Sequence, residues 1–121
     1  MLIKNELKTI IAGSRNCTHY DDLLRAIDVI GWRPSVILSG GARGVDAMGE
    51  RWASENNIMV QKYPAEWDKY GKAAGYRRNV QMAENADALL SLWDFKSRGT
   101  KHMIDICTKK CMVIYVWKVA P

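Results

Sequence analysis

Short apolar runs alternate along the chain with longer segments in which apolar residues recur at helical spacing. The apolar runs predict five strands, over residues 7–12, 35–38, 58–63, 88–93 and 112–119. The segments between them predict four helices, over residues 21–30, 45–56, 72–85 and 100–108. Strands that are apolar along almost their whole length are typical of a parallel sheet covered on both faces.

The alternation of strands and helices indicates a parallel sheet, because each parallel pair needs a crossover connection. We therefore expect an α/β fold, a three-layer Rossmann-like sandwich of five parallel strands in the order 3-2-1-4-5. The length of 121 residues predicts a single domain over residues 1–121. In this strand order the direction of winding reverses between the first and fourth strands. Ligands bind open parallel sheets at such a switch point, beyond the carboxyl ends of the strands.

Three polar, glycine-bearing turns follow the first, second and fourth of the predicted strands. The strand order brings their carboxyl ends together, so we expect the three turns to converge on one edge of the sheet. In the first turn, backbone amides, a hydroxyl and a guanidinium fork suit a phosphate or a ribose. The candidate ligand contacts in this turn are Gly13, Ser14 and Arg15.

The second turn is the most glycine-rich of the three and leads directly into a predicted helix. A helix N-terminus offers unpaired amides to an anion, and glycine lets the backbone approach that anion closely. We interpret the turn as a phosphate cradle, although a strand–helix turn can also need glycine for geometry alone. Its candidate ligand contacts are Ser39, Gly40, Gly41, Arg43 and Gly44. Asp46 follows in the first helical turn, where it either complements the helix dipole or orients Arg15 or a ribose hydroxyl.

The third turn begins at Asp94 and ends at Gly99 and Thr100, where a second helix starts at the switch point. Thr100 is expected to cap this helix or to contact a phosphate, and the two roles are compatible. Two aromatic residues, Trp67 and Tyr70, lie in a predicted loop over residues 65–71. They either stack on a base or pack onto the edge of the sheet.

Composition narrows the class of ligand rather than the fold. The net charge of +5 favours anionic partners such as nucleotides or nucleic acid. The three cysteines have no metal-ligand spacing and fit a reducing compartment, so we expect neither a metal nor a cofactor. No apolar run is long enough to cross a bilayer, and residues 1–8 do not resemble a signal peptide. We expect a cytoplasmic protein with no membrane partner.

The motifs on these turns resemble those of the SLOG superfamily, which includes the Rossmann domain of DNA-processing protein A and the "lonely guy" enzymes. The resemblance rests on Gly-Ser-Arg at residues 13–15 and Ser-Gly-Gly-Ala-Arg-Gly-Val-Asp-Ala at residues 39–47. Residues 65–75, Ala-Glu-Trp-Asp-Lys-Tyr-Gly-Lys-Ala-Ala-Gly, and residues 77–82, Arg-Arg-Asn-Val-Gln-Met, are similar to the small single-domain YspA/YpsA-like branch. Gly99-Thr100 fits the Gly-Thr that starts the last helix of this branch.

The resemblance implies a nucleotide-type ligand and adds Arg78 and Asn79, which match the branch signature, to the candidate contacts. It also implies self-association into a homo-oligomer. It does not carry over the catalysis of the "lonely guy" enzymes, because the Pro-Gly-Gly of their motif is missing and Met103 stands in place of its glutamate. The chain further departs from the branch at Glu66, where aspartate is usual, and at Tyr76 and Arg77.

The main interpretation is a domain that senses or sequesters a nucleotide or a nucleotide-derived small molecule. A first alternative is hydrolysis of a nucleotide N-glycosidic bond, with Glu66 and Asp94 as weak candidates for the general acid and base. A second alternative is a single-stranded DNA-binding module, in which Arg43 and Arg78 follow the phosphates. His19 and His102 are isolated and suggest no catalytic set.

Overall fold

The sheet has the strand order that the sequence predicts. The structure is a computed structural model that describes residues 6–120. Its five parallel strands lie in the order β3-β2-β1-β4-β5. The strands are β1 (Glu6–Gly13), β2 (Arg33–Ser39), β3 (Met59–Lys62), β4 (Ala88–Trp93) and β5 (Val113–Lys118). This confirms the expected α/β, Rossmann-like sheet and places its switch point between β1 and β4.

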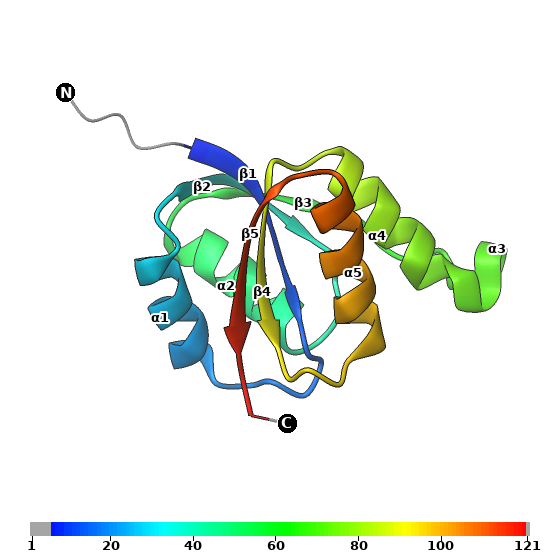
Figure 1. The fold of residues 1–121 in the computed structure, drawn as a ribbon, viewed down its shortest axis with the longest axis horizontal. Coiled ribbons are helices and arrows are strands. Elements are labelled where there is room, and N and C mark those ends of the chain that lie inside the picture. Colours follow the sequence, from blue (N-terminus) through cyan, green and yellow to red (C-terminus); the bar gives the residue numbers. More distant parts are fainter. Residues whose placement is uncertain (1–5, 121) are drawn as a thin grey trace.

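Helices cover both faces of the sheet, so that it forms the middle of three layers (Figure 1). The helices are α1 (Tyr20–Val29), α2 (Val45–Glu55), α3 (Trp67–Tyr70), α4 (Ala74–Glu84) and α5 (Arg98–Lys109), with a 3₁₀ turn at Gly71–Ala73. In Figure 1, α1 and α2 lie on one side of the sheet and α4 and α5 lie on the other. The short helix α3 projects from the N-terminal end of α4, away from the sheet.

Two buried hydrophobic clusters fill the spaces between these layers. Under α1 and α2, Leu23, Trp32 and Trp52 pack with Ile11 and other strand residues. On the opposite face, side chains of α4 and α5 pack against Ile10, Leu38 and Leu89. Because consecutive strand residues point to opposite faces, Ile10 and Ile11 bury one side chain in each cluster.

Two helix starts differ from the sequence prediction. The predicted loop over residues 65–71 contains α3, and the following helix begins with a 3₁₀ turn before α4. Helix α5 begins at Arg98, and its N-cap is Ser97, so the prediction that Thr100 caps it is wrong. The physical reason is that Asp94 Oδ1 accepts hydrogen bonds from the amides of Lys96 and Ser97, which turns the chain into the helix two residues early.

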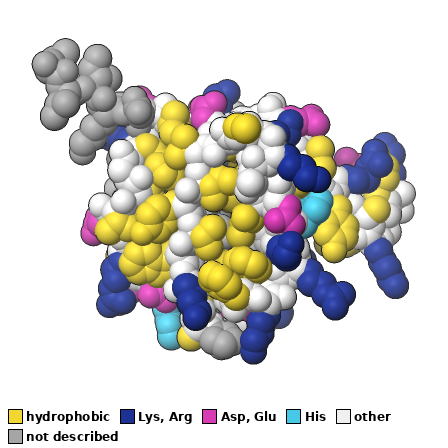
Figure 2. Space-filling model, in the orientation of Figure 1, with side chains coloured by type: hydrophobic (Ala, Val, Ile, Leu, Met, Phe, Trp, Pro, Cys, Tyr) yellow, Lys and Arg dark blue, Asp and Glu magenta, His cyan; other side chains and the backbone are white. Residues whose placement is uncertain are grey.

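Hydrophobic side chains gather on the face shown in Figure 2, over α1 and the edge strand β5. Leu24 and Val29 of α1 and Val113 of β5 are among the exposed large apolar residues. The expected homo-oligomer remains a prediction, because no partner chain tests it. Within residues 6–120, none of the helices has both the length and the apolar character needed to cross a membrane.

The backbone junction at the end of β1 holds three elements together. Ser14 donates its amide to the Leu92 carbonyl at 3.2 Å and accepts the Val45 amide at 3.2 Å, which fixes the start of α2 against β1 and β4. Gly13 makes this approach possible, since a Cβ there would overlap the Leu92 carbonyl oxygen and lie 2.9 Å from Val45 Cγ2. The glycine is therefore required by packing within the protein.

We expect Gly13→Ala to lower the free energy of unfolding by about 1–3 kcal/mol, because the new methyl group overpacks this junction. The matched control is Gly99→Ala, where an added Cβ would meet nothing within 4 Å. The control should be neutral or slightly stabilising, since alanine is the better helix former. Urea denaturation measures both effects. Equal stability of the two variants would contradict the role given to Gly13.

Candidate functional site

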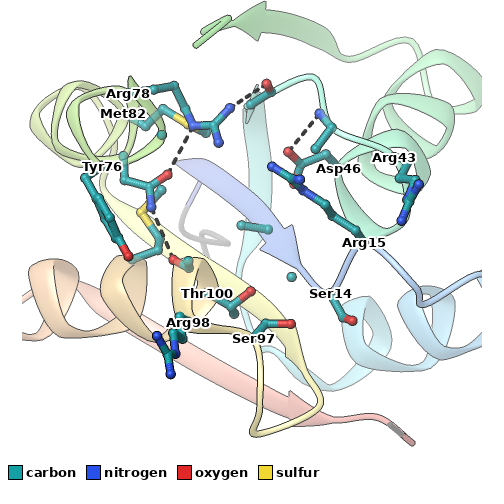
Figure 3. A pocket seen from close by; sticks show the side chains of 18 of the residues that line it. Ser14, Arg15, Arg43, Asp46, Tyr76, Arg78, Met82, Ser97, Arg98 and Thr100 are labelled. Carbon is teal, nitrogen blue, oxygen red and sulfur yellow. Dashed lines mark hydrogen bonds between the residues drawn. The ribbon is translucent and has the colours of Figure 1, made fainter. Parts of the chain in front are cut away.

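A cleft of about 450 Å³ opens at the carboxyl end of the sheet, where the turns after β1, β2 and β4 meet the N-terminal half of α4 (Figure 3). Its volume lies in the range of small-molecule sites in proteins. The candidate residues that line it are Gly13, Ser14, Arg15, Gly40, Arg43, Asp46, Trp67, Arg78, Asn79, Gly99 and Thr100. The expected convergence of the three turns on one edge of the sheet is therefore confirmed.

Three further candidates lie beside the cleft and do not line it. Ser39 is fully buried, donates its hydroxyl to Glu50 Oε2 at 2.6 Å and accepts the Gly41 amide at 3.1 Å. Gly41 lines a neighbouring hollow. Gly44 has a positive φ of 76°, and a Cβ there would overlap the backbone carbonyls of Ser14 and Arg15. Ser39 and Gly44 shape the turn from within the protein.

The amides at the start of α2 are largely occupied by the protein itself. Ala42 donates its amide to Asp46 Oδ2 at 3.2 Å, in addition to the bonds from Gly41 to Ser39 and from Val45 to Ser14. The expectation of a free phosphate cradle in this turn therefore does not hold for these three amides. The carboxylate of Asp46 takes the place that an anion would have at this helix N-terminus.

The N-terminus of α5 presents the opposite situation. Lys101 donates its amide to the Ser97 carbonyl at 3.1 Å, but within residues 6–120 the amides of Arg98, Gly99 and Thr100 have no such acceptor. The Thr100 side chain is only 6% exposed, and the structure gives its hydroxyl no hydrogen-bond partner among the described residues. Figure 3 shows this hydroxyl on the cleft side of α5. This end of the cleft has unused donors for an anion.

Arg78 and Asn79 connect the two ends of the cleft. Arg78 Nη1 donates to the Gly40 carbonyl at 2.7 Å, and Arg78 Nε donates to Asn79 Oδ1 at 3.1 Å. Asn79 Nδ2 in turn donates to the Gly99 carbonyl at 3.2 Å and lies 3.2 Å from His102 Nδ1. Through these bonds α4 holds the turn after β2 and the start of α5 at a fixed separation. Figure 3 shows the chain of contacts along one wall.

Positive charge dominates the lining of the cleft. Its cationic residues are Arg15, Arg43, Lys72, Arg78 and Arg98, and its one carboxylate is Asp46. Such an excess of one sign of charge attracts anionic ligands. Sequence reasoning missed Lys72, Tyr76 and Arg98. Lys72 lies inside the Gly-Lys-Ala-Ala-Gly motif, and Arg98 directly precedes Gly99. Their positions next to candidate ligand contacts in the sequence could have indicated that they also line the cleft.

Asp46 is a buried carboxylate in this cationic surrounding. Burial raises the pKa of Asp46 from 3.8 to about 6, and Glu50 on the same helix adds to the rise. The Ala42 amide, Arg78 from α4 and Arg15 from the turn after β1 lower the pKa without cancelling the effect of burial. At neutral pH the side chain is ionised but poorly solvated, which costs the fold stability.

Aromatic side chains stand at the outer rim. Trp67 is 51% exposed and lines both the cleft and the neighbouring hollow, with its ring close to Gly75. Tyr76 also lines the cleft and makes an edge-on contact with the His102 ring, at 4.5 Å between centroids. Tyr70, the other predicted stacking residue, lies away from the cleft under the Arg77 guanidinium at 3.9 Å. The available stacking surface is therefore Trp67 with Tyr76.

The two carboxylates expected to act as a general acid and base are not together in the cleft. Glu66 is exposed and lines a different hollow, beside Tyr70 and Arg77. Asp94 accepts the amides of Lys96 and Ser97 and the Ser14 hydroxyl. These bonds, led by the Ser97 amide, hold the pKa of Asp94 below its ordinary value. Asp94 is therefore a poor proton donor and serves to shape the turn.

A parallel sheet of this strand order, with a ligand-sized cleft at its switch point, defines a Rossmann-like α/β domain. The chain belongs to the YspA, cpYpsA-related SLOG family, whose family model matches residues 7–70.

Two known proteins show how far this similarity extends. The Gene 61 protein of Mycobacterium phage D29 is 37% identical over 73 residues, which cover 55% of this chain and 58% of that protein. The X-ray structure of DNA processing protein A from Streptococcus pneumoniae is similar with a TM-score of 0.71 and 17% identity, over 90% of this chain and 49% of that one. This chain thus spans about half the length of the proteins it matches, and the structural likeness supports the Rossmann-like fold.

We expect Asp46→Asn to be more stable than the native protein at neutral pH. The raised pKa means that the folded protein retains a proton between pH 3.8 and about 6 that the unfolded chain has lost, so stability falls as pH rises through this window. Asparagine can still accept the Ala42 amide without a buried charge. The gain should be on the order of 2–3 kcal/mol at neutral pH and should vanish below about pH 4.

Urea denaturation across this pH range measures the difference. Asp28→Asn removes an exposed carboxylate from α1 and serves as the control, which should show no comparable gain. A gain of the same size at every pH would mean that the cost does not come from ionisation of Asp46.

Proposed function

We propose that the protein binds a nucleotide or a nucleotide-derived small molecule in the cleft, with a phosphate at the N-terminus of α5. The observation that carries this proposal is the set of unused donors there: the amides of Arg98, Gly99 and Thr100 and the Thr100 hydroxyl on the cleft side of α5. A helix N-terminus of this kind binds phosphate through its amides and its dipole. Membership of the SLOG family is consistent with a nucleotide-related ligand.

The residues around the N-terminus of α5 also favour a phosphate at this position. Arg98 lies beside the phosphate position, and Lys72 and Arg15 line the same cleft from other elements. The start of α2 is the less favourable end for a phosphate, because the carboxylate of Asp46 would repel it. A phosphate therefore lies at α5, and the remainder of the ligand extends across the cleft toward Asp46 and Trp67.

Binding rather than turnover is the activity that the side chains support. Neither Glu66 nor Asp94 is placed to act as an acid or base on a ligand in the cleft. We propose that the protein senses or sequesters its ligand. Release of free base on incubation with nucleotides would instead support the alternative function, hydrolysis of the N-glycosidic bond.

We expect Gly99→Asp to weaken nucleotide binding strongly without weakening the fold. An added Cβ at Gly99 meets no protein atom within 4 Å, and a carboxylate in the first turn of a helix is favourable. The same carboxylate occupies the phosphate position and repels the ligand. Isothermal titration calorimetry with nucleoside 5′-monophosphates should show an affinity lower by about tenfold or more.

Asn57→Asp provides a control with the same change of charge. Asn57 is exposed and precedes β3, at the opposite end of the sheet from the cleft. It should bind nucleotides as the native protein does. Native affinity in Gly99→Asp would overturn the assignment of the phosphate to α5.

We expect Trp67 to carry the base. Stacking of a base on an aromatic ring is worth about 1–3 kcal/mol, so Trp67→Ala should weaken nucleotide binding by roughly 5- to 150-fold. Trp67→Tyr retains a stacking surface and should recover most of the loss. Calorimetry on the two variants measures the contribution, together with ligand quenching of tryptophan fluorescence that is present in the native protein and lost in Trp67→Ala. Unchanged affinity in Trp67→Ala would exclude stacking at this position.

A single-stranded DNA-binding module is the second candidate. The observation in its favour is a hollow that continues the cleft past Trp67 and shares Arg15, Arg43 and Arg78 with it. The structural relative named above is a DNA processing protein, although the likeness shows the fold alone. Binding of single strands that falls steeply with salt and exceeds binding of mononucleotides would favour this candidate.

A further inference from the structure

Asp46 has an acceptor that the protein leaves unused. Its Oδ2 accepts the Ala42 amide at 3.2 Å, while Oδ1 has no hydrogen-bond partner in the part of the chain that the structure describes. Arg15 and Arg78 are close enough to lower the pKa of Asp46, yet within residues 6–120 neither forms an ion pair with its carboxylate. The side chain is 7% exposed, and that exposure faces the cleft, which it lines. Among the described residues the one buried side-chain polar atom without a partner is Ser91 Oγ, so Asp46 Oδ1 is accessible from the cleft. A ligand donor that reaches it forms a hydrogen bond to a charged acceptor, which is stronger than a bond between neutral groups.

The chemistry of a carboxylate defines what that donor can be. An ionised carboxylate only accepts hydrogen bonds, so the ligand must present hydroxyl or amine hydrogens to it. With the phosphate at α5 and the base at Trp67, the sugar is the part of a nucleotide that lies between them. The sugar hydroxyls are therefore the donors closest to Asp46.

We propose that Asp46 accepts hydrogen bonds from the ribose hydroxyls of the ligand and thereby selects free ribonucleotides. This inference rests on the proposed function and adds the class of nucleotide. It has a second consequence, because a carboxylate repels phosphate. A second phosphate on the 2′ or 3′ oxygen, or the 3′ phosphodiester of a continuing strand, places negative charge against Asp46 and weakens binding.

The weaker binding expected for a nucleotide with a second phosphate distinguishes recognition by Asp46 from attraction by the net charge of the cleft. A cleft with five cationic residues and one carboxylate would, by net charge alone, bind a nucleotide with two phosphates more tightly than one with a single phosphate. Recognition of the hydroxyls by Asp46 reverses this order. The role of Asp46 is thus tested in two ways, by ligands that lack the ribose hydroxyls and by ligands that carry a second phosphate in their place.

The experiment is calorimetry with matched ligands of one base, chosen as the tightest of the four nucleoside 5′-monophosphates. The native protein should bind the ribonucleotide about tenfold or more tightly than its 2′,3′-dideoxy counterpart. It should also bind the 5′-monophosphate more tightly than the 3′,5′-bisphosphate. In Asp46→Asn the preference for the ribonucleotide over the dideoxynucleotide should fall at least about threefold. The preference for the monophosphate over the bisphosphate should reverse, since the negative charge at residue 46 is lost.

Asp28→Asn is the control and should retain both differences. Equal affinity of the native protein for the ribonucleotide and the dideoxynucleotide, or an unchanged difference in Asp46→Asn, overturns the role of Asp46 and leaves the proposed function standing. Absence of binding by every nucleotide overturns the proposed function, and this inference with it. Retained folding of Asp46→Asn is checked by its thermal unfolding.

Discussion

The close backbone contact at the end of β1 is the constraint on which the rest of the structure depends. Gly13 and Ser14 lie between Leu92 of β4 and Val45 of α2, with two hydrogen bonds of 3.2 Å and no room for a side chain at Gly13. Gly44, at the start of α2, allows an equally close approach to the backbone carbonyls of Ser14 and Arg15. Because these contacts fix the start of α2 and the end of β4 relative to β1, they also fix the position of the cleft between the three turns.

Much of this arrangement follows from the sequence because it depends on local pattern. Apolar runs such as residues 88–93 and the helical spacing of Leu23 and Ile27 specify the elements, and right-handed crossovers then restrict the order of the strands. The convergence of the three turns follows from that order. Helix starts were harder to predict, since the start of α5 depends on hydrogen bonds from the Lys96 and Ser97 amides to Asp94.

The roles of individual glycines could not be predicted because they depend on contacts between distant segments. Gly13 and Gly44 are needed where backbones approach, and Gly40 leaves space for the Arg78 guanidinium, which a Cβ would approach to 2.5 Å. Gly99, in contrast, faces open space. The glycine-rich turn after β2 was the natural position for a phosphate on sequence grounds. The carboxylate of Asp46, four residues beyond Ala42, accepts the Ala42 amide and so satisfies part of that turn from within the protein.

The bond between Arg78 and Asn79 has a consequence for a ring in another helix. A guanidinium only donates, so Arg78 Nε fixes Asn79 with its oxygen toward the arginine and its amide nitrogen toward α5. That nitrogen also only donates, so the facing His102 Nδ1 accepts and the ring carries its hydrogen on Nε2. Burial lowers the pKa of His102, which favours the neutral ring. An arginine on α4 thereby determines where the proton resides on a histidine of α5. Acidification that adds a second proton to His102 removes one of the two α5 acceptors of Asn79 and leaves the Gly99 carbonyl as the other.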